Sequence, residues 1–153
     1  MSVEEMSRFM RELEHTADVM YLVESESLIK LFEIAALGMF SYITDLNTVN
    51  EIECVSVKAE GFDLESLMYR WLENLLIEHD LRKFVARRVR VDSITIRKTE
   101  NEESFLIEGF ACGERFDREK HPAGIVVKAV TYSQMSIERD TNGIWRTKIV
   151  LDI

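Results

Sequence analysis

The chain has 153 residues, of which 46% are hydrophobic and 31% are charged. This is the length of one ordinary domain, and the apolar content is sufficient for a packed core, so a wholly disordered chain is excluded. Acidic residues outnumber basic ones by 28 to 19, and the net charge of −9 opposes broad attraction to nucleic-acid phosphates. Any contact with RNA is therefore expected to be indirect or local.

The sequence lacks the features that mark membrane and secreted proteins. No apolar run approaches the length of a membrane span, and residues 1–11 are too charged for the apolar core of a signal peptide. Cys54 and Cys112 each lie in an alternating apolar run, which favours reduced, buried thiols over a disulfide. We therefore expect no contact with membranes and a cytoplasmic protein, with the nucleus as the alternative.

The first half of the chain alternates predicted strands with predicted helices. Alternating apolar residues predict a strand over 19–23, and apolar residues at steps of three and four predict an amphipathic helix over 27–43. A second strand is predicted over 54–57. A second amphipathic helix is expected from Leu64 to about His79, with Asp63 placed to cap its free amides.

The second half of the chain predicts strands alone. Apolar positions change from odd to even numbers between Val91 and Ile94, so a bulge near residues 92–93 is needed to keep one strand face buried. Further strands are expected over 104–112, 125–139 and 144–153, the last two joined by a hairpin turn at Asn142-Gly143. Together the elements predict an α+β fold: one compact domain with a mainly antiparallel β-sheet packed with two amphipathic α-helices.

Acidic groups at the two ends of the chain are candidate metal ligands. Asp18 precedes an apolar strand, where a carboxylate must stay solvated, accept hydrogen bonds or bind a cation. Asp152 and the α-carboxylate of Ile153, together with a main-chain carbonyl, form an oxygen set that suits a hard cation. In the plainer interpretation, Asp18 is a polar strand end and Asp152 faces solvent, paired with Arg146 or Lys148.

Two basic features are candidates as well. Lys128 lies in a predicted strand with apolar residues on both faces, so its ammonium is expected to lack full hydration and to need a partner. Residues 82–98 carry seven basic residues and one acid, a local net charge of +6. This stretch could contact an acidic partner or RNA phosphates, although solvation of an open strand face is the commoner role of such residues.

Motifs of the common enzyme classes are missing from the sequence. It contains no glycine-rich nucleotide-binding loop, no serine-nucleophile motif and no cysteine beside a plausible base. His15, His79 and His121 are far apart and lack the spacing of zinc ligands. No catalytic residue is assigned.

Five separated motifs together resemble the archease family. They are LEHTAD at 13–18, AALGMF at 35–40, FDREKH at 116–121, VKAVTY at 127–132 and LDI at 151–153. Their order and approximate spacing agree with the family, which implies an archease-like domain over 13–153 and an N-terminal extension over 1–12 whose order or disorder stays open. The chain departs from many members in having Val19-Met20-Tyr21 for Ile-Gly-Ile, and Ser133 for histidine.

The resemblance implies an accessory protein rather than an enzyme. Archeases assist the RtcB-type RNA ligase, which joins RNA ends in tRNA splicing after guanylylation of its own active-site histidine. In the family, the aspartate of the HTAD motif, the penultimate aspartate and the last residue form a divalent-cation site, often occupied by calcium. These match Asp18, Asp152 and Ile153, and Lys128 matches a position implicated in activity.

The expected function is therefore that of a metal-binding activator, which promotes ligase guanylylation and multiple turnover as a monomer or small oligomer. Ca²⁺ is the first choice of metal, with Mg²⁺ and Mn²⁺ as alternatives. Two other functions are open: a stand-alone metal-dependent phosphohydrolase, and a metal-independent protein-interaction or chaperone-like module.

Overall fold

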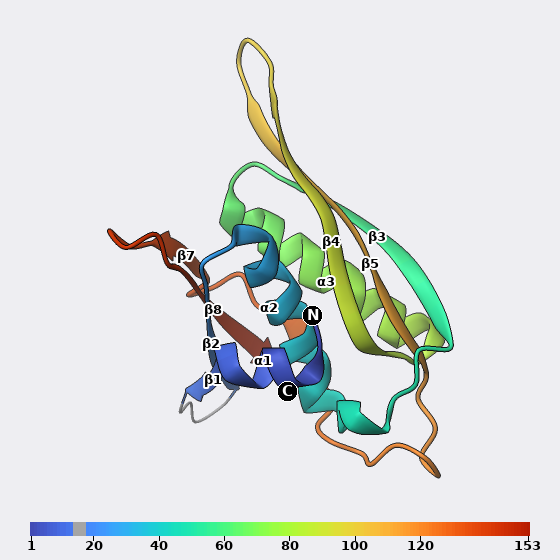
Figure 1. Cartoon of the computed structure of the whole chain (residues 1–153). Helices are drawn as coiled ribbons and strands as arrows, with labels where there is room; N and C mark the ends of the chain where they lie inside the picture. Colours follow the sequence, from blue (N-terminus) through green and yellow to red (C-terminus); the bar gives the residue numbers. More distant parts are fainter. Residues whose placement is uncertain (14–17) are drawn as a thin grey trace.

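Two antiparallel sheets and three α-helices form a single domain in a computed structural model that describes residues 1–13 and 18–153 (Figure 1). Sheet A has the strand order β1-β2-β8-β6, with β7 also paired to β8, and sheet B has the order β3-β5-β4. The predicted α+β class and antiparallel pairing are confirmed, but the strands divide into two sheets and a third helix is present. The helices are α1 (Val3–Phe9), α2 (Leu28–Ile43) and α3 (Leu64–Arg82), and the strands are β1 (Met10–Leu13), β2 (Val19–Ser25), β3 (Glu53–Gly61), β4 (Phe84–Lys98), β5 (Glu103–Arg115), β6 (Ala129–Val130), β7 (Ser136–Arg139) and β8 (Trp145–Asp152).

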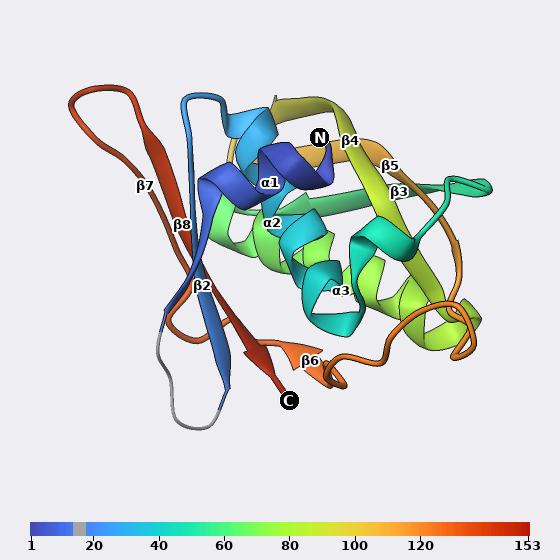
Figure 2. The same ribbon diagram turned by 60° about the horizontal axis from the view of Figure 1, so that its bottom comes forward.

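Helix α2 is the centre of the molecule. Ser27 caps its first turn by accepting a hydrogen bond from the Lys30 N–H group, and every residue from Leu31 to Phe40 is buried. The helix packs against β4 of sheet B and against β2 and β8 of sheet A, so it lies between the two sheets (Figure 2). A helix that is apolar on nearly all sides is expected in such a position, because no side of it meets water.

Helix α3 has one buried face, which packs mainly on sheet B. Asp63 and Ser66 form a reciprocal capping box at its start, which confirms the predicted cap. The helix ends at Arg82, nearly one turn later than predicted, with Lys83 in a left-handed conformation (φ 58°). Its buried residues are Ser66, Leu67, Met68, Trp71, Leu72, Leu75 and Leu76.

The predicted bulge in the long strand β4 is confirmed. The pairing register with β5 shifts between Val91 and Ser93, and a second shift lies between Ala86 and Arg88. At the first shift, a buried carboxylate oxygen of Glu33 on α2 accepts the Val91 N–H group at 2.9 Å. A bulge leaves backbone groups without a strand partner, and Glu33 supplies the acceptor for one of them.

The prediction of one strand over 125–139 is wrong. Residues 116–128, here called the strap, have no helix or strand structure and cross the C-terminal end of α2. There the N–H groups of Gly124 and Ile125 each donate at 2.9 Å to main-chain carbonyls of Ile43 and Tyr42, respectively. The last carbonyls of a helix lack intrahelical donors, so this segment pairs with the helix end instead of a sheet. The predicted hairpin between β7 and β8 is confirmed, with Gly143 at φ 84°.

The N-terminal segment is folded onto the body of the protein. Ser2 caps α1, and Val3 and Met6 of this short helix are buried. Strand β1 then pairs with β2. Within the described residues, no helix is both long and apolar enough to cross a membrane.

The prediction of reduced, buried cysteines is wrong as well. Cys54 on β3 and Cys112 on β5 are register partners and form a disulfide with a Cα–Cα distance of 4.0 Å. Cys112 is buried, whereas Cys54 is exposed. Residues directly opposite in an antiparallel pair approach closely, but the sequence does not reveal which strands are neighbours. Because these cysteines form a disulfide, reduced thiols no longer support the expected cytoplasmic location.

Candidate functional site

The acidic residues from the two ends of the chain lie at one end of sheet A. Val19 and Leu151 are register partners of the antiparallel strands β2 and β8. Asp18 comes directly before Val19, and Asp152 comes directly after Leu151, so continuing the register by one residue sets the two aspartates opposite each other. Figure 2 shows the C terminus, β6 and the start of β2 together at this end of the sheet. We call this place the sheet A end site.

The strap brings Lys128 to the same place. Ala129 on β6 is the register partner of Asp152, and the Lys128 N–H group donates to the Asp152 main-chain carbonyl at 2.7 Å. All four residues that the sequence singled out, Asp18, Lys128, Asp152 and Ile153, therefore belong to adjacent strand ends. Two of the predicted features change: the Lys128 side chain is exposed rather than short of hydration, and the Asp152 carbonyl is engaged by Lys128.

The sheet A end site is accessible to solvent. Asp18 and Asp152 are half-buried, and Ile153 is 40% exposed. Carboxylates in such positions keep part of their hydration and can still meet a ligand from outside. The site is therefore placed to bind a hydrated ion or to contact another molecule.

The expected cation partners of Asp152 are engaged elsewhere or do not reach it. Arg146 forms ion pairs with Asp140 at 2.6 Å and with Glu24 at 3.3 Å. Over residues 1–13 and 18–153, neither Arg146 nor Lys148 pairs with the Asp152 carboxylate, and no other side chain does. The plainer interpretation, in which these cations neutralise Asp152, is thus not what the structure contains.

The donor set at this site fits a hard divalent cation. Two aspartate side chains and the terminal carboxylate supply oxygen alone, the ligand type that Ca²⁺, Mg²⁺ and Mn²⁺ prefer. In the part of the chain that the structure describes, no group of three or more His, Cys, Asp or Glu side chains is arranged for a metal.

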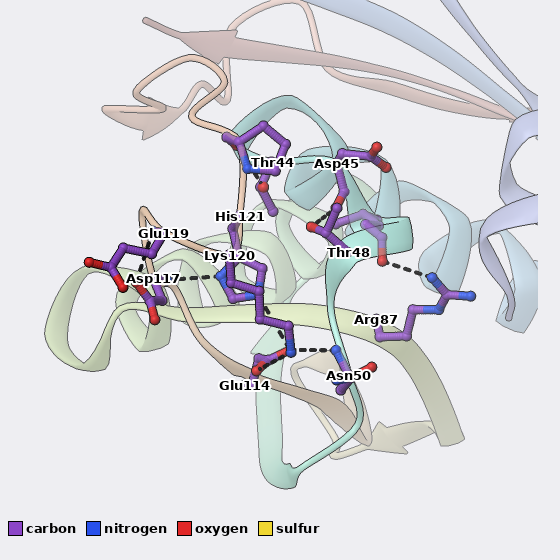
Figure 3. Close-up of polar contacts among 12 residues, drawn as sticks. Thr44, Asp45, Thr48, Asn50, Arg87, Glu114, Asp117, Glu119, Lys120 and His121 are labelled. Atoms are coloured by element: carbon purple, nitrogen blue, oxygen red, sulfur yellow. Dashed lines mark hydrogen bonds and ion pairs between the residues drawn. The ribbon is translucent and has the colours of Figure 1, made fainter.

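A second polar cluster holds the strap in place and is centred on Glu114 (Figure 3). The Glu114 carboxylate accepts hydrogen bonds from the Asn50 N–H group at 2.5 Å and from Lys120 at 2.7 Å. Nε2 of His121 lies 3.3 Å from the same carboxylate. Partial burial alone would raise the pKa of Glu114, but the contacts with Asn50, Lys120 and His121 outweigh it and lower the pKa below the ordinary value.

The ring of His121 has a defined role in this cluster. The ring is buried, with 1% of the residue exposed, and its Nδ1 accepts the Asp117 N–H group at 2.8 Å. Because Nδ1 is an acceptor, the proton of the neutral ring is on Nε2, which faces Glu114. The histidine therefore links the turn of the strap to β5, as a structural element rather than as a metal ligand.

His79 also lies away from the sheet A end site, at the end of α3. Nδ1 of His79 contacts the Phe84 carbonyl at 2.9 Å, and because a carbonyl only accepts, this nitrogen is the donor. His15 lies outside the described residues. The motif at 116–121 was the one signal in the sequence for the Glu114 cluster, and nothing there indicated that Glu114 and Asn50 belong to it.

The basic stretch over residues 82–98 is not a continuous free surface. Arg82 pairs with Glu78, and Arg88 pairs with Glu51 at 2.7 Å. Arg87 donates to the Leu46 carbonyl at 2.8 Å. Local pairing of this kind favours the solvation role for most of the stretch.

Comparisons with known proteins agree over most of the chain. A family model described as the Archease protein family (MTH1598/TM1083) matches residues 10–153. Proteins named protein archease from Thermococcus gammatolerans and Aeropyrum pernix are 41% and 40% identical over 140 residues, which is 92% of this chain and 95% and 94% of theirs. The solution structure of Methanobacterium thermoautotrophicum protein 1598 has a TM-score of 0.77 and 30% identity, over 95% of this chain and 99% of that one. The matched residues include all four at the sheet A end site.

Proposed function

Because this chain belongs to the archease family, we propose that it activates an RtcB-type RNA ligase, promoting guanylylation of the ligase and its multiple turnover. In this proposal the protein is an accessory factor, and the chemical step takes place on the ligase. The observation that supports the proposal is the pairing of β2 with β8, whose register, continued by one residue, places Asp18 and the last two residues at one end of sheet A.

The proposal includes a divalent cation held by these three groups, with calcium as the first choice and magnesium or manganese as alternatives. Such an ion, when bound, neutralises carboxylate charge and presents a positive centre to phosphate oxygens. Two features of the chain position these ligands. Pairing of β2 with β8 sets Asp18 opposite Asp152, and the Lys128 N–H group fixes the main chain of Asp152.

Lys128 has a separate role in the proposal. Its main chain supports Asp152, while its exposed ammonium adds a positive charge beside the carboxylates. An ammonium in this position attracts phosphate or carboxylate groups of a partner from solution. We assign it to contact with the guanylylated ligase or its nucleotide, rather than to metal binding.

The first prediction tests the site through the ligase. Asp152→Asn keeps the size of the side chain but removes its charge, so it should lower both the initial rate of ligase guanylylation and the number of turnovers at least tenfold. The assay combines purified ligase, GTP and a divalent ion with this protein below stoichiometry, and counts ligated RNA ends per ligase. Glu100→Gln, at the exposed tip of the β4–β5 hairpin, is the matched control and should leave activation unchanged.

Full activation by Asp152→Asn at saturating concentration would remove the sheet A end site from the mechanism. Metal-dependent hydrolysis of phosphate esters by the purified protein without any ligase would instead favour the phosphohydrolase alternative.

A further inference from the structure

A groove of about 480 Å³ lies between the C-terminal end of α3 and the strap. Buried side chains of Ile43 and Val127 form part of its wall, and Val126 lines it with 77% of the residue exposed. Three cationic residues, Lys83, Arg115 and Arg118, also line it. The groove thus combines an apolar wall with basic side chains, and its lining includes none of Asp18, Lys128, Asp152 and Ile153.

In the described part of the chain, the three cations of the groove are not engaged by other side chains. Lys83, Arg115 and Arg118 are exposed, and within the described residues none of their side chains forms an ion pair or hydrogen bond. Asp80 is the one carboxylate among the groove-lining residues. In a chain of net charge −9, this local excess of positive charge attracts an anionic partner.

The groove is built on well-fixed backbone. Lys83 is the left-handed cap residue of α3, and its carbonyl accepts the Phe116 N–H group at 2.7 Å. Arg115 is the register partner of Phe84 on β4. The strap is held in turn by the Glu114 cluster and by the end of α2, so the backbone that carries the cations is fixed before any partner arrives, which reduces the backbone entropy lost on binding.

The composition of the groove favours a protein partner over single-stranded RNA. Base stacking needs a free aromatic face, and the one lining phenyl ring, that of the half-buried Phe116, already has one face stacked on His121 with centroids 5.6 Å apart. The exposed apolar surface comes from the aliphatic Val126, which suits an aliphatic side chain of another protein. A segment with carboxylates flanking apolar residues complements both features.

We propose that this groove docks an acidic segment with apolar side chains from a partner protein. Under the proposed function the partner is the RNA ligase, so the identity of the partner rests on that proposal. Val126 and Val127 line the groove and Lys128 follows directly at the sheet A end site, while the strap connects the two places (Figure 2). One partner can therefore contact the groove and the sheet A end site together, and the groove supplies affinity and orientation.

The test measures binding of purified ligase to this protein by biolayer interferometry at about 50 mM and 300 mM salt. The double substitution Arg115→Glu with Arg118→Glu should weaken binding at least tenfold at low salt, and the difference should shrink at high salt, because screening reduces charge attraction. Arg97→Glu with Lys98→Glu, on the exposed tip of the β4–β5 hairpin, makes the same charge change and should weaken binding less than threefold. Val126→Ser should weaken binding several-fold at both salt concentrations.

Circular dichroism and thermal unfolding establish that the variants fold. Unchanged affinity in the Arg115/Arg118 variant, or equal losses in the two charge-reversed pairs, would overturn the groove assignment and leave the proposed function standing. Binding of a labelled RNA that depends on Arg115 and Arg118, with ligase affinity unchanged, would assign the groove to RNA and overturn it as well. If the wild-type protein neither binds nor stimulates the ligase, the proposed function itself fails and this assignment fails with it.

Discussion

At the scale of single residues, the carboxylates of this protein are divided between two tasks. Glu114 is engaged by Asn50 and Lys120 and stabilises the strap, whereas the Asp152 side chain pairs with no side chain in the described part of the chain. A carboxylate with several donors is a structural group, and one whose charge is uncompensated at an open strand end is available to a ligand. This difference separates the Asp152 carboxylate from that of Glu114.

Glu114 gives a prediction about pH. Its pKa in the folded protein is below the ordinary value of 4.5, so its contribution to stability is present above that value and is lost as the pH falls through the folded pKa. Glu114→Gln should therefore lower the urea midpoint at pH 7, and the gap to the wild type should narrow as the pH falls below the ordinary pKa of 4.5. The control Glu60→Gln, at an exposed position of β3, should keep the wild-type midpoint at both pH values. An equal gap at pH 7 and pH 3 would contradict the assignment.

At the scale of elements, periodicity predicted α2, α3 and most strands, because their apolar residues repeat at the spacing of the element itself. The bulge in β4 was predicted for the same reason. The strap was not predicted, because an apolar run such as 125–130 is also compatible with a strand. In the structure this segment pairs with the C-terminal end of α2, which is far away in the sequence. The Oγ1 atom of Thr44, just past α2, donates to the Pro122 carbonyl at 2.7 Å and adds a side-chain link to this contact.

Thr44 tests how the strap is held. Thr44→Val keeps the shape of this buried side chain but leaves the Pro122 carbonyl without its donor, so it should cost about 1 kcal/mol of unfolding free energy. It should also speed amide hydrogen exchange over residues 117–125, measured by mass spectrometry, before exchange rises elsewhere. Thr48→Val removes an exposed hydroxyl contact with the Asp45 carbonyl and is the matched control, expected to leave strap exchange unchanged. If the strap amides exchange at the wild-type rate in both variants, Thr44 does not hold the strap.

At the scale of the whole molecule, the pairing of β2 with β8 brings the region of Asp18 next to the last residues of the chain. Strand β8 pairs with β2, β6 and β7, so it gathers the last residues, the strap and the region of Asp18 at one sheet end. The site residues could be named from the sequence, through family motifs, but their meeting depends on long-range strand pairing that no local pattern encodes. The same limit applies to the disulfide between Cys54 and Cys112, which forms because β3 and β5 are adjacent strands.

The central claim is that Asp18, Asp152 and the chain terminus share one cation, and calorimetric titration of metal-free protein with Ca²⁺ tests it most directly. We predict one binding event per chain in the wild type and in Glu100→Gln, and at least tenfold weaker binding in Asp152→Asn. Mg²⁺ and Mn²⁺ titrations rank the alternative ions at the same site. Absence of binding of all three ions to the wild type, or equal affinity in Asp152→Asn, would contradict the claim.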